Sequence, residues 1–176
     1  MYADNTLTPK EAARLCALGI LATREAVSYG ELAASVRHFL DRVQGPSLDV
    51  LGSSFELLKF EGLVKTAGTG AEAQLTLTDA GRHELISLLT AGLRPGATDL
   101  NKLVVALKFR FLHLLNSDEQ RIQVDVMLDT VETELARLAD LRTHHANESG
   151  HLTTWLDREI SQLSERADWL RNFEPI

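Results

Sequence analysis

The segment 46–81 decides the fold; it reads PSLDVLGSSFELLKFEGLVKTAGTGAEAQLTLTDAG. Apolar residues recur at helical spacing in its first part, at Leu48, Leu51, Phe55 and Leu58, and Gly62 then ends the helix. Two short strands follow over 63–67 and 74–77, separated by a glycine-rich tip, and Thr78 caps another helix. A helix, a hairpin and a second helix in this order are typical of a winged helix-turn-helix. In that module the helix before the wing faces a DNA groove.

The residues before this segment supply two more helices. Thr8-Pro9 begins the first, which runs to about Thr23. Ser28 caps the second, and Glu31 completes a capping box three residues later. The turn at 44–46 contains Gly and Pro, and we expect Ser47 to cap the third helix. Thr78 caps the fourth, which we expect to end at Leu89. These elements make residues 1–90 the predicted winged helix-turn-helix domain.

The remainder of the chain is predicted to be a linker followed by helices. Residues 91–99 contain Gly and Pro and lack periodicity, so they indicate a linker. Residues 100–176 are then an antiparallel helical dimerisation domain. Its first helix buries Leu103, Leu107, Phe111 and Leu114; the next is capped by Ser117, with Gln120 closing a capping box. The expected fold class is therefore mainly α, with a small β-hairpin wing.

Two later helices carry narrow apolar seams at alternating steps of four and three residues, a coiled-coil pattern. Such seams are satisfied either within one antiparallel hairpin or by a second subunit, and we favour a two-fold homodimer. The predicted dimerisation residues are Val124, Leu128, Val131, Leu135, Leu138, Leu156, Ile160, Leu163, Trp169 and Leu170.

The length, cysteine count and net charge of the chain limit the classes of protein to which it can belong. The 176 residues can bury a core, and no apolar run approaches the roughly 20 residues of a membrane span. One cysteine, Cys16, and the absence of a secretory signal indicate the cytoplasm. The net charge is −7: residues 1–90 have 8 Lys+Arg against 11 Asp+Glu, and the rest have 10 against 14. Neither half is basic, which counts against strong non-specific DNA binding.

No pattern of catalytic, cofactor-binding or metal-ligating residues stands out. The sequence lacks a nucleophile elbow, a Walker loop and a dinucleotide fingerprint, so we expect no enzyme and no cofactor. His144, His145 and His151 flank a polar loop without a nearby cysteine, and we expect no metal site there. Lys108 lies beside the buried face of its helix, and we expect its charge to reach solvent at the margin.

The chain resembles the PadR-like transcriptional regulators over most of its length. The first half contains Phe55-x-x-Leu58-x-x-x-Gly62-Leu63-Val64 and then Leu75-x-Leu77-Thr78-x-x-Gly81. The second half contains the run 107–115, LKFRFLHLL, then Glu119-x-Arg121, Glu134-Leu135-x-x-Leu138 and Ala167-Asp168-Trp169-Leu170. The resemblance implies a two-fold dimer whose wings bind a palindromic operator. It also implies a repressor, sometimes released by a small hydrophobic or phenolic ligand.

The outward side of the third helix and the neighbouring surface supply the candidates for DNA contact. We expect Ser47, Ser53, Ser54 and Lys59 to face the groove, and Tyr29, Arg42 and Lys65 to lie near the phosphates. The wing tip 66–74 contains Glu72 and no Lys or Arg. The apolar residues Val50, Leu57 and Phe60 leave an alternative open, in which the winged helix has lost DNA binding and acts as a protein-interaction adaptor.

Overall fold

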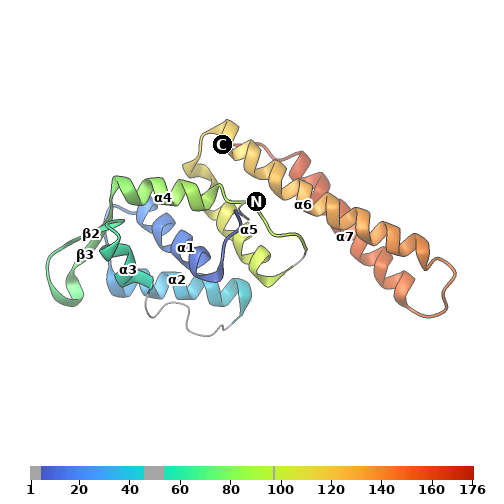
Figure 1. The fold of residues 1–176 in the computed structure, drawn as a ribbon, viewed down its shortest axis with the longest axis horizontal. Helices are drawn as coiled ribbons and strands as arrows, with labels where there is room; N and C mark the ends of the chain where they lie inside the picture. Colours follow the sequence, from blue (N-terminus) through green and yellow to red (C-terminus); the bar gives the residue numbers. More distant parts are fainter. Residues whose placement is uncertain (1–4, 46–53, 97) are drawn as a thin grey trace. The chain divides into compact units, whose positions relative to one another are not determined.

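The computed structural model describes residues 5–45, 54–96 and 98–176, and these form two compact units. Unit 1 comprises Met1–Gly92 and Thr98–Leu115, and unit 2 comprises Leu93–Ala97 and Asn116–Ile176. The division differs from the predicted domain ranges, because the helix after residue 98 belongs to unit 1. Figure 1 shows the elements of both units.

Unit 1 contains five α-helices, among the residues that the structure describes, with a small sheet beside them (Figure 1). The helices are α1 (Pro9–Thr23), α2 (Tyr29–Gln44), α3 (Ser54–Phe60), α4 (Asp79–Leu89) and α5 (Asp99–Phe111), followed by the short 3-10 turn η2 (Leu112–Leu114). The first two begin as predicted: the side chains of Thr8 and Ser28 each accept a backbone N–H, and their own backbone N–H groups donate to the carboxylates of Glu11 and Glu31. The predicted start of the third helix at Ser47 lies outside the described residues.

The sheet has three antiparallel strands, β1 (Val27–Ser28), β2 (Val64–Ala67) and β3 (Gln74–Leu77), in the order β1-β3-β2. β2 and β3 form the predicted wing, with Val64 opposite Leu77 and Ala67 opposite Gln74. The connection contains the 3-10 turn η1 (Gly70–Glu72). The sequence analysis did not predict β1, because a two-residue strand has no periodicity of its own. Val27 nevertheless pairs with Leu75 and joins the wing to the core.

The core of unit 1 is centred on α1, which packs against α2, α3, α4, α5 and β3. Leu15, Cys16, Leu18 and Ile20 on this helix have at most 1% of their surface exposed. Gly19 allows α5 to approach closely, because a β-carbon there would lie 2.5 Å from the ring of Phe111. The mainly helical, winged fold class predicted from the sequence is confirmed.

Unit 2 is a hairpin of two long helices, α6 (Ser117–His144) and α7 (Leu152–Arg171) (Figure 1). The helices are antiparallel, because Arg142 near the end of α6 pairs with Asp157 near the start of α7, while Glu132 pairs with Arg171. Val124 and Leu156 are fully buried and Leu170 is nearly so. These members of the predicted seams are thus buried within one protomer. Within the described residues, no helix is long and apolar enough to span a bilayer.

The cap of α6 is one residue earlier than predicted. Asn116, not Ser117, is the N-cap: its side chain accepts the N–H of Glu119, and the Glu119 carboxylate accepts the N–H of Asn116. Two capping boxes overlap here, and the box with a charged acceptor forms. The prediction of Ser117 with Gln120 is therefore wrong. Gln120 instead is buried and exchanges two hydrogen bonds with the backbone of Ile176, at 3.1 and 3.2 Å.

Candidate nucleic-acid interface

Helix α3 has an apolar inner side and a mixed outer side. Phe55 and Leu58 are buried against the core, with 5% and 1% of their surface exposed. Glu56, Leu57, Lys59 and Phe60 point outward. Phe60 is 89% exposed and Leu57 46% exposed, so apolar surface and one positive charge lie together on this side. The polar side chains on the outer side could contact base edges in a DNA groove, and its apolar side chains could contact a protein partner.

The end of α3 is set by Gly62. Its φ of +73° lies in the left-handed region that favours glycine. The N–H of Leu63 donates to the carbonyl of Leu58 at 2.9 Å, and the N–H of Gly62 donates to the carbonyl of Lys59 at 3.1 Å. These two bonds make a Schellman motif, and Leu63 and Leu58 are both buried beneath it. The motif turns the chain directly from α3 into the wing.

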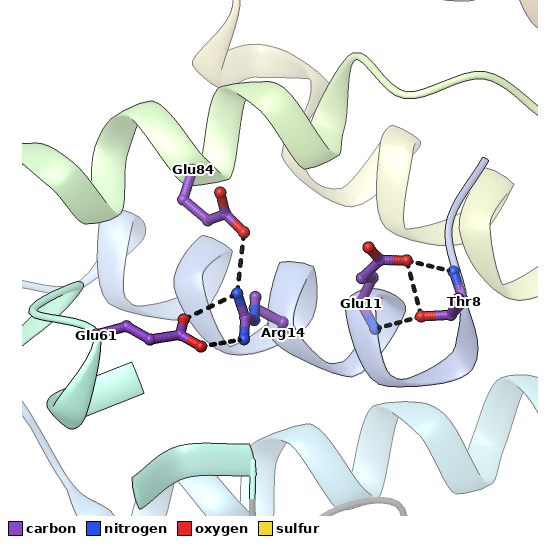
Figure 2. A network of polar contacts seen from close by, with 5 residues as sticks. All are labelled: Thr8, Glu11, Arg14, Glu61 and Glu84. Carbon is purple, nitrogen blue, oxygen red and sulfur yellow. Dashed lines mark hydrogen bonds and ion pairs between the residues drawn. The ribbon is translucent and has the colours of Figure 1, made fainter. Parts of the chain in front are cut away.

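Arg14 ties the turn after α3 to the rest of unit 1 (Figure 2). Its Nη1 lies 3.0 Å from Oε2 of Glu61 and 3.1 Å from Oε1 of Glu84, and its Nη2 donates to Oε1 of Glu61 at 3.0 Å. Burial acts to lower the pKa of Arg14, but the bonds to Glu84 and Glu61 outweigh it and raise the pKa above its ordinary value. One guanidinium thus joins α1, α4 and the end of α3, and offsets an acidic charge beside the candidate interface.

Helix α4 also holds this turn. The hydroxyl of Thr78 donates to the carbonyl of Gly62 at 2.7 Å, and the N–H of Thr78 donates to the carbonyl of Leu63 at 3.1 Å. The first turn of α4 lies so close that a β-carbon on Gly81 would be 2.1 Å from the carbonyl oxygen of Leu63. The glycine in the Leu77-Thr78-x-x-Gly81 pattern is therefore required by close packing of α4 on the start of the wing.

The wing carries its one lysine on β2 and none at its tip. Lys65 is exposed and lies opposite Thr76. Gly68 and Gly70 adopt positive φ, at +88° and +71°, and Glu72 at the tip is exposed. Since phosphates attract cations, the tip contributes no positive charge to DNA binding. The base of the wing contributes one.

The residues predicted to contact DNA fall into two groups. Tyr29, Arg42, Lys59 and Lys65 are exposed in unit 1. Tyr29, the first residue of α2, packs the edge of its ring on Phe55, with the ring centroids 5.7 Å apart. This contact joins the starts of α2 and α3. Ser47 and Ser53 lie outside the described residues, and Ser54 is the first described residue of α3.

Arg14 is a positioning residue that the sequence analysis missed. It lies on the first helix, 47 residues before Glu61, and nothing local in the sequence connects the two. Helical spacing places Arg14 beside the buried stripe of α1, and that edge position was the only available signal.

Lys108 differs most from its prediction. It is fully buried, and its ammonium donates to the carbonyl of Leu89, in the last turn of α4, at 2.6 Å. Burial lowers its pKa from 10.5 to about 8. The expectation that its charge reaches solvent is wrong, because the carbonyls at a helix end attract a cation inside the core.

The cysteine and histidine side chains of the two units are the candidates for a reactive thiol and for metal ligands. Burial raises the pKa of Cys16 to about 12, although Arg110, whose Nη1 lies 3.7 Å from its sulfur, opposes this. The thiol is therefore unreactive. His145 pairs with Glu148 beside His144. In the described ranges, no group of three His, Cys, Asp or Glu side chains has the arrangement to hold a metal ion.

Comparison with solved structures finds matches that include crystal structures of Bacillus subtilis PadR. The first, PadR alone, is 18% identical, covers 94% of this chain and 94% of that one, and has a TM-score of 0.42. PadR in complex with p-coumaric acid is 17% identical, with 94% and 95% covered and a TM-score of 0.41. PadR in complex with operator DNA is 19% identical, with 90% and 94% covered and a TM-score of 0.37. A search of the curated proteins found no match.

The family comparison covers almost the whole chain. Residues 2–174 match the family described as "Putative AphA-like transcriptional regulator". The match confirms the recognition of a PadR-like transcriptional regulator, and it identifies a family of regulators and not of enzymes. The chain belongs to the AphA-like family of transcriptional regulators.

Proposed function

We propose that this regulator acts as a cytoplasmic homodimer, binds a palindromic DNA operator through α3 and the wing, and represses transcription. The observation that carries the proposal is the fixed arrangement around Gly62. The Schellman motif, the Arg14 network and the contact of α4 hold α3 and β2 together while Lys59 and Lys65 stay exposed. Such preorganisation suits the insertion of one helix into a major groove.

The charges on this surface favour base reading over strong phosphate attraction. Arg42, Lys59 and Lys65 are exposed cations, and Glu56 is an exposed acid on the outer side of α3. A glutamate accepts a hydrogen bond from cytosine N4, which discriminates between base pairs without attracting the backbone. Glu61 repels the DNA phosphates less than a free carboxylate would, because Arg14 binds its carboxylate. We therefore expect moderate affinity with a marked preference for one sequence.

Selection from a random duplex library at low salt, followed by a mobility shift, tests the proposal. We expect an enriched palindrome with half-sites about 34 Å apart, one helical turn. Lys59→Ala and Lys65→Ala should weaken its binding, while Lys102→Ala, on the exposed side of α5, should not. A library that yields no preferred duplex contradicts the proposal.

A second candidate function is supported by the apolar surface of α3. Phe60, with 89% of its surface exposed, and Leu57, with 46%, suit a protein partner better than a phosphate backbone. In that case the chain is an adaptor that binds another regulator. Phe60→Asp would then abolish regulation while Lys59→Ala left it intact. The opposite pattern, with Lys59→Ala the more damaging change, supports DNA.

The resemblance to PadR-like regulators extends the proposal to a small hydrophobic or phenolic effector. An effector must bind the DNA-free form more tightly than the DNA-bound form in order to release the operator. Titration of a phenolic acid into the protein–operator complex tests this, and an unchanged mobility shift at saturating acid contradicts it.

A further inference from the structure

The middle of α3 exposes an apolar side chain next to an acidic one. Leu57 is 46% exposed and its neighbour Glu56 is exposed, whereas Phe55 and Leu58 are buried on the inner side. Successive residues of a helix are about 100° apart, so the inner side is centred between Phe55 and Leu58. Glu56 and Leu57 each lie roughly 130° from that centre, on opposite flanks of the outward side. The two side chains therefore stand side by side and point away from the core.

The other outward residues of α3 are placed less well for contact with bases. Lys59 lies only about 70° from the centre of the inner side, at the margin of the helix, where a cation meets phosphates. Phe60 points outward and is almost fully exposed, but it is the last residue of α3. A recognition helix contacts base edges mainly through its N-terminal residues. Glu56 and Leu57 are therefore the better placed of the four to reach the bases.

A leucine side chain can recognise one feature of a base edge in the major groove. Among the four standard bases, thymine alone presents a methyl group there, while the other edges present hydrogen-bond donors and acceptors. Contact with that methyl group removes apolar surface of both partners from water, which is favourable. Opposite another base, Leu57 would displace water from polar groups without replacing their hydrogen bonds, which costs free energy. The same side chain therefore discriminates in favour of thymine.

We propose that Leu57 is a specificity-determining residue that reads the 5-methyl group of one thymine in each half-site of the operator. The inference rests on the proposed function, DNA binding through α3, and adds the identity of a base that this helix reads. Leu57 and Glu56 differ by a rise of about 1.5 Å along the helix, less than the roughly 3.4 Å between base pairs. If Glu56 accepts from cytosine N4, the thymine therefore lies in the same base step as that cytosine.

Replacement of thymine by uracil in the selected operator tests the contact. Deoxyuridine pairs with adenine as thymidine does and lacks only the methyl group. It is placed at one thymine of each half-site at a time, at symmetric positions, and mobility shifts give the dissociation constants. We expect one pair of positions at which the constant rises roughly fifteenfold, from about fourfold for each of the two methyl groups. Uracil at the other thymines should have a much smaller effect.

The variant Leu57→Ala assigns the methyl effect to this side chain. We expect it to bind the thymine operator more weakly than the wild type does, and uracil at the sensitive positions should then cost nothing further. A double-mutant cycle between the protein and the DNA measures this coupling. Phe60→Ala, which removes a second exposed apolar side chain of α3, is the matched control and should keep the full effect of uracil. Alanine favours the helix at both positions, and circular dichroism checks the fold.

A change of specificity gives a second, independent readout. Glutamine binds adenine through N6 and N7 in the major groove, and it has no use for a methyl group. Selection from the random library, repeated with Leu57→Gln, should therefore replace thymine by adenine at the sensitive position and leave the rest of the half-site unchanged. Return of the wild-type sequence from this selection counts against a contact between Leu57 and the base.

The outcomes separate the role of Leu57 from DNA binding itself. An operator that tolerates uracil at every position overturns the role of Leu57, and so does a uracil effect that persists in full in Leu57→Ala. Either result leaves the proposed function intact, because the selection has then already found a preferred duplex. A library that yields no preferred duplex overturns both the proposed function and the reading of thymine.

Discussion

Lys108 shows how a single residue can couple stability to pH. Its pKa is about 8 in the folded chain, against 10.5 ordinarily, because the charged form is buried. Between these pH values the unfolded chain binds more protons, so the free energy of unfolding rises as the pH rises from about 8 to 10.5. A shift of this size corresponds to about 3 kcal/mol at most.

We therefore expect Lys108→Met to flatten this part of the stability profile. Methionine keeps most of the volume but has no charge to bury. Urea unfolding of both proteins at intervals from pH 7 to 10.5 measures the difference, and subtraction of the two curves removes the titration of other groups. If both proteins gain the same stability over this range, Lys108 is not the source.

Residues such as Lys108 and Arg14 were beyond prediction because their roles depend on distant partners. Lys108 is positioned by the carbonyl of Leu89, and Arg14 by Glu61 and Glu84. These partners come together only when α1, α4 and α5 pack. Helical periodicity identifies which side of a helix is buried, but it does not reveal that a buried cation meets a helix end. Cys16 is the converse case, because it is a small residue within the apolar stripe of α1 and its burial follows from that local pattern.

At the scale of elements, the contact between α4 and the wing depends on Gly81. We expect Gly81→Ala to lower the free energy of unfolding by roughly 2–3 kcal/mol, because the new methyl group meets the backbone of Leu63 and not a flexible side chain. Gly30→Ala is the matched control: this helical glycine in α2 has no atom within 4 Å of the new methyl group. Alanine there should stabilise by up to about 1 kcal/mol. Chemical denaturation measures both, and equal effects would contradict the packing role of Gly81.

The start of α6 provides a second test at this scale. Asn116→Ala removes the observed cap and should cost about 1 kcal/mol, whereas Ser117→Ala should change stability by a few tenths. Thermal unfolding of the two variants compares them. A greater loss for Ser117→Ala would restore the cap that the sequence pattern predicted.

Elements were predicted well where a local signal specified them. Thr8, Ser28 and Thr78 begin their helices as expected, because the cap and its partner lie within three residues. The start of α6 was misassigned because two overlapping signals competed, and β1 was missed because it forms only through Leu75 and Gln74 of a distant strand. Of the candidate DNA-contact residues, those outside 46–53 lie exposed or on α3, while their contacts with DNA stay a prediction.

For the whole molecule, the net charge of −7 makes the salt dependence of operator binding a sensitive measure. With three or four phosphate contacts per subunit, the slope of log Kobs against log salt should be roughly −5 to −7 for a dimer. Lys65→Ala removes one contact from each subunit and should reduce the slope by about 2. Lys102→Ala on α5 should leave it unchanged. Mobility shifts from 50 to 200 mM salt measure this, and an unaltered slope for Lys65→Ala would remove the wing lysine from the interface.

The lack of Lys and Arg at the wing tip has a consequence for how such a regulator would search a chromosome. Non-specific affinity for DNA comes from phosphate neutralisation, and this surface offers little of it. Few copies would be held on bulk DNA at any moment, so nearly the whole pool would be free to sample sites by diffusion through the cell. Occupancy of the target gene would then follow the copy number closely, with little buffering by the rest of the genome.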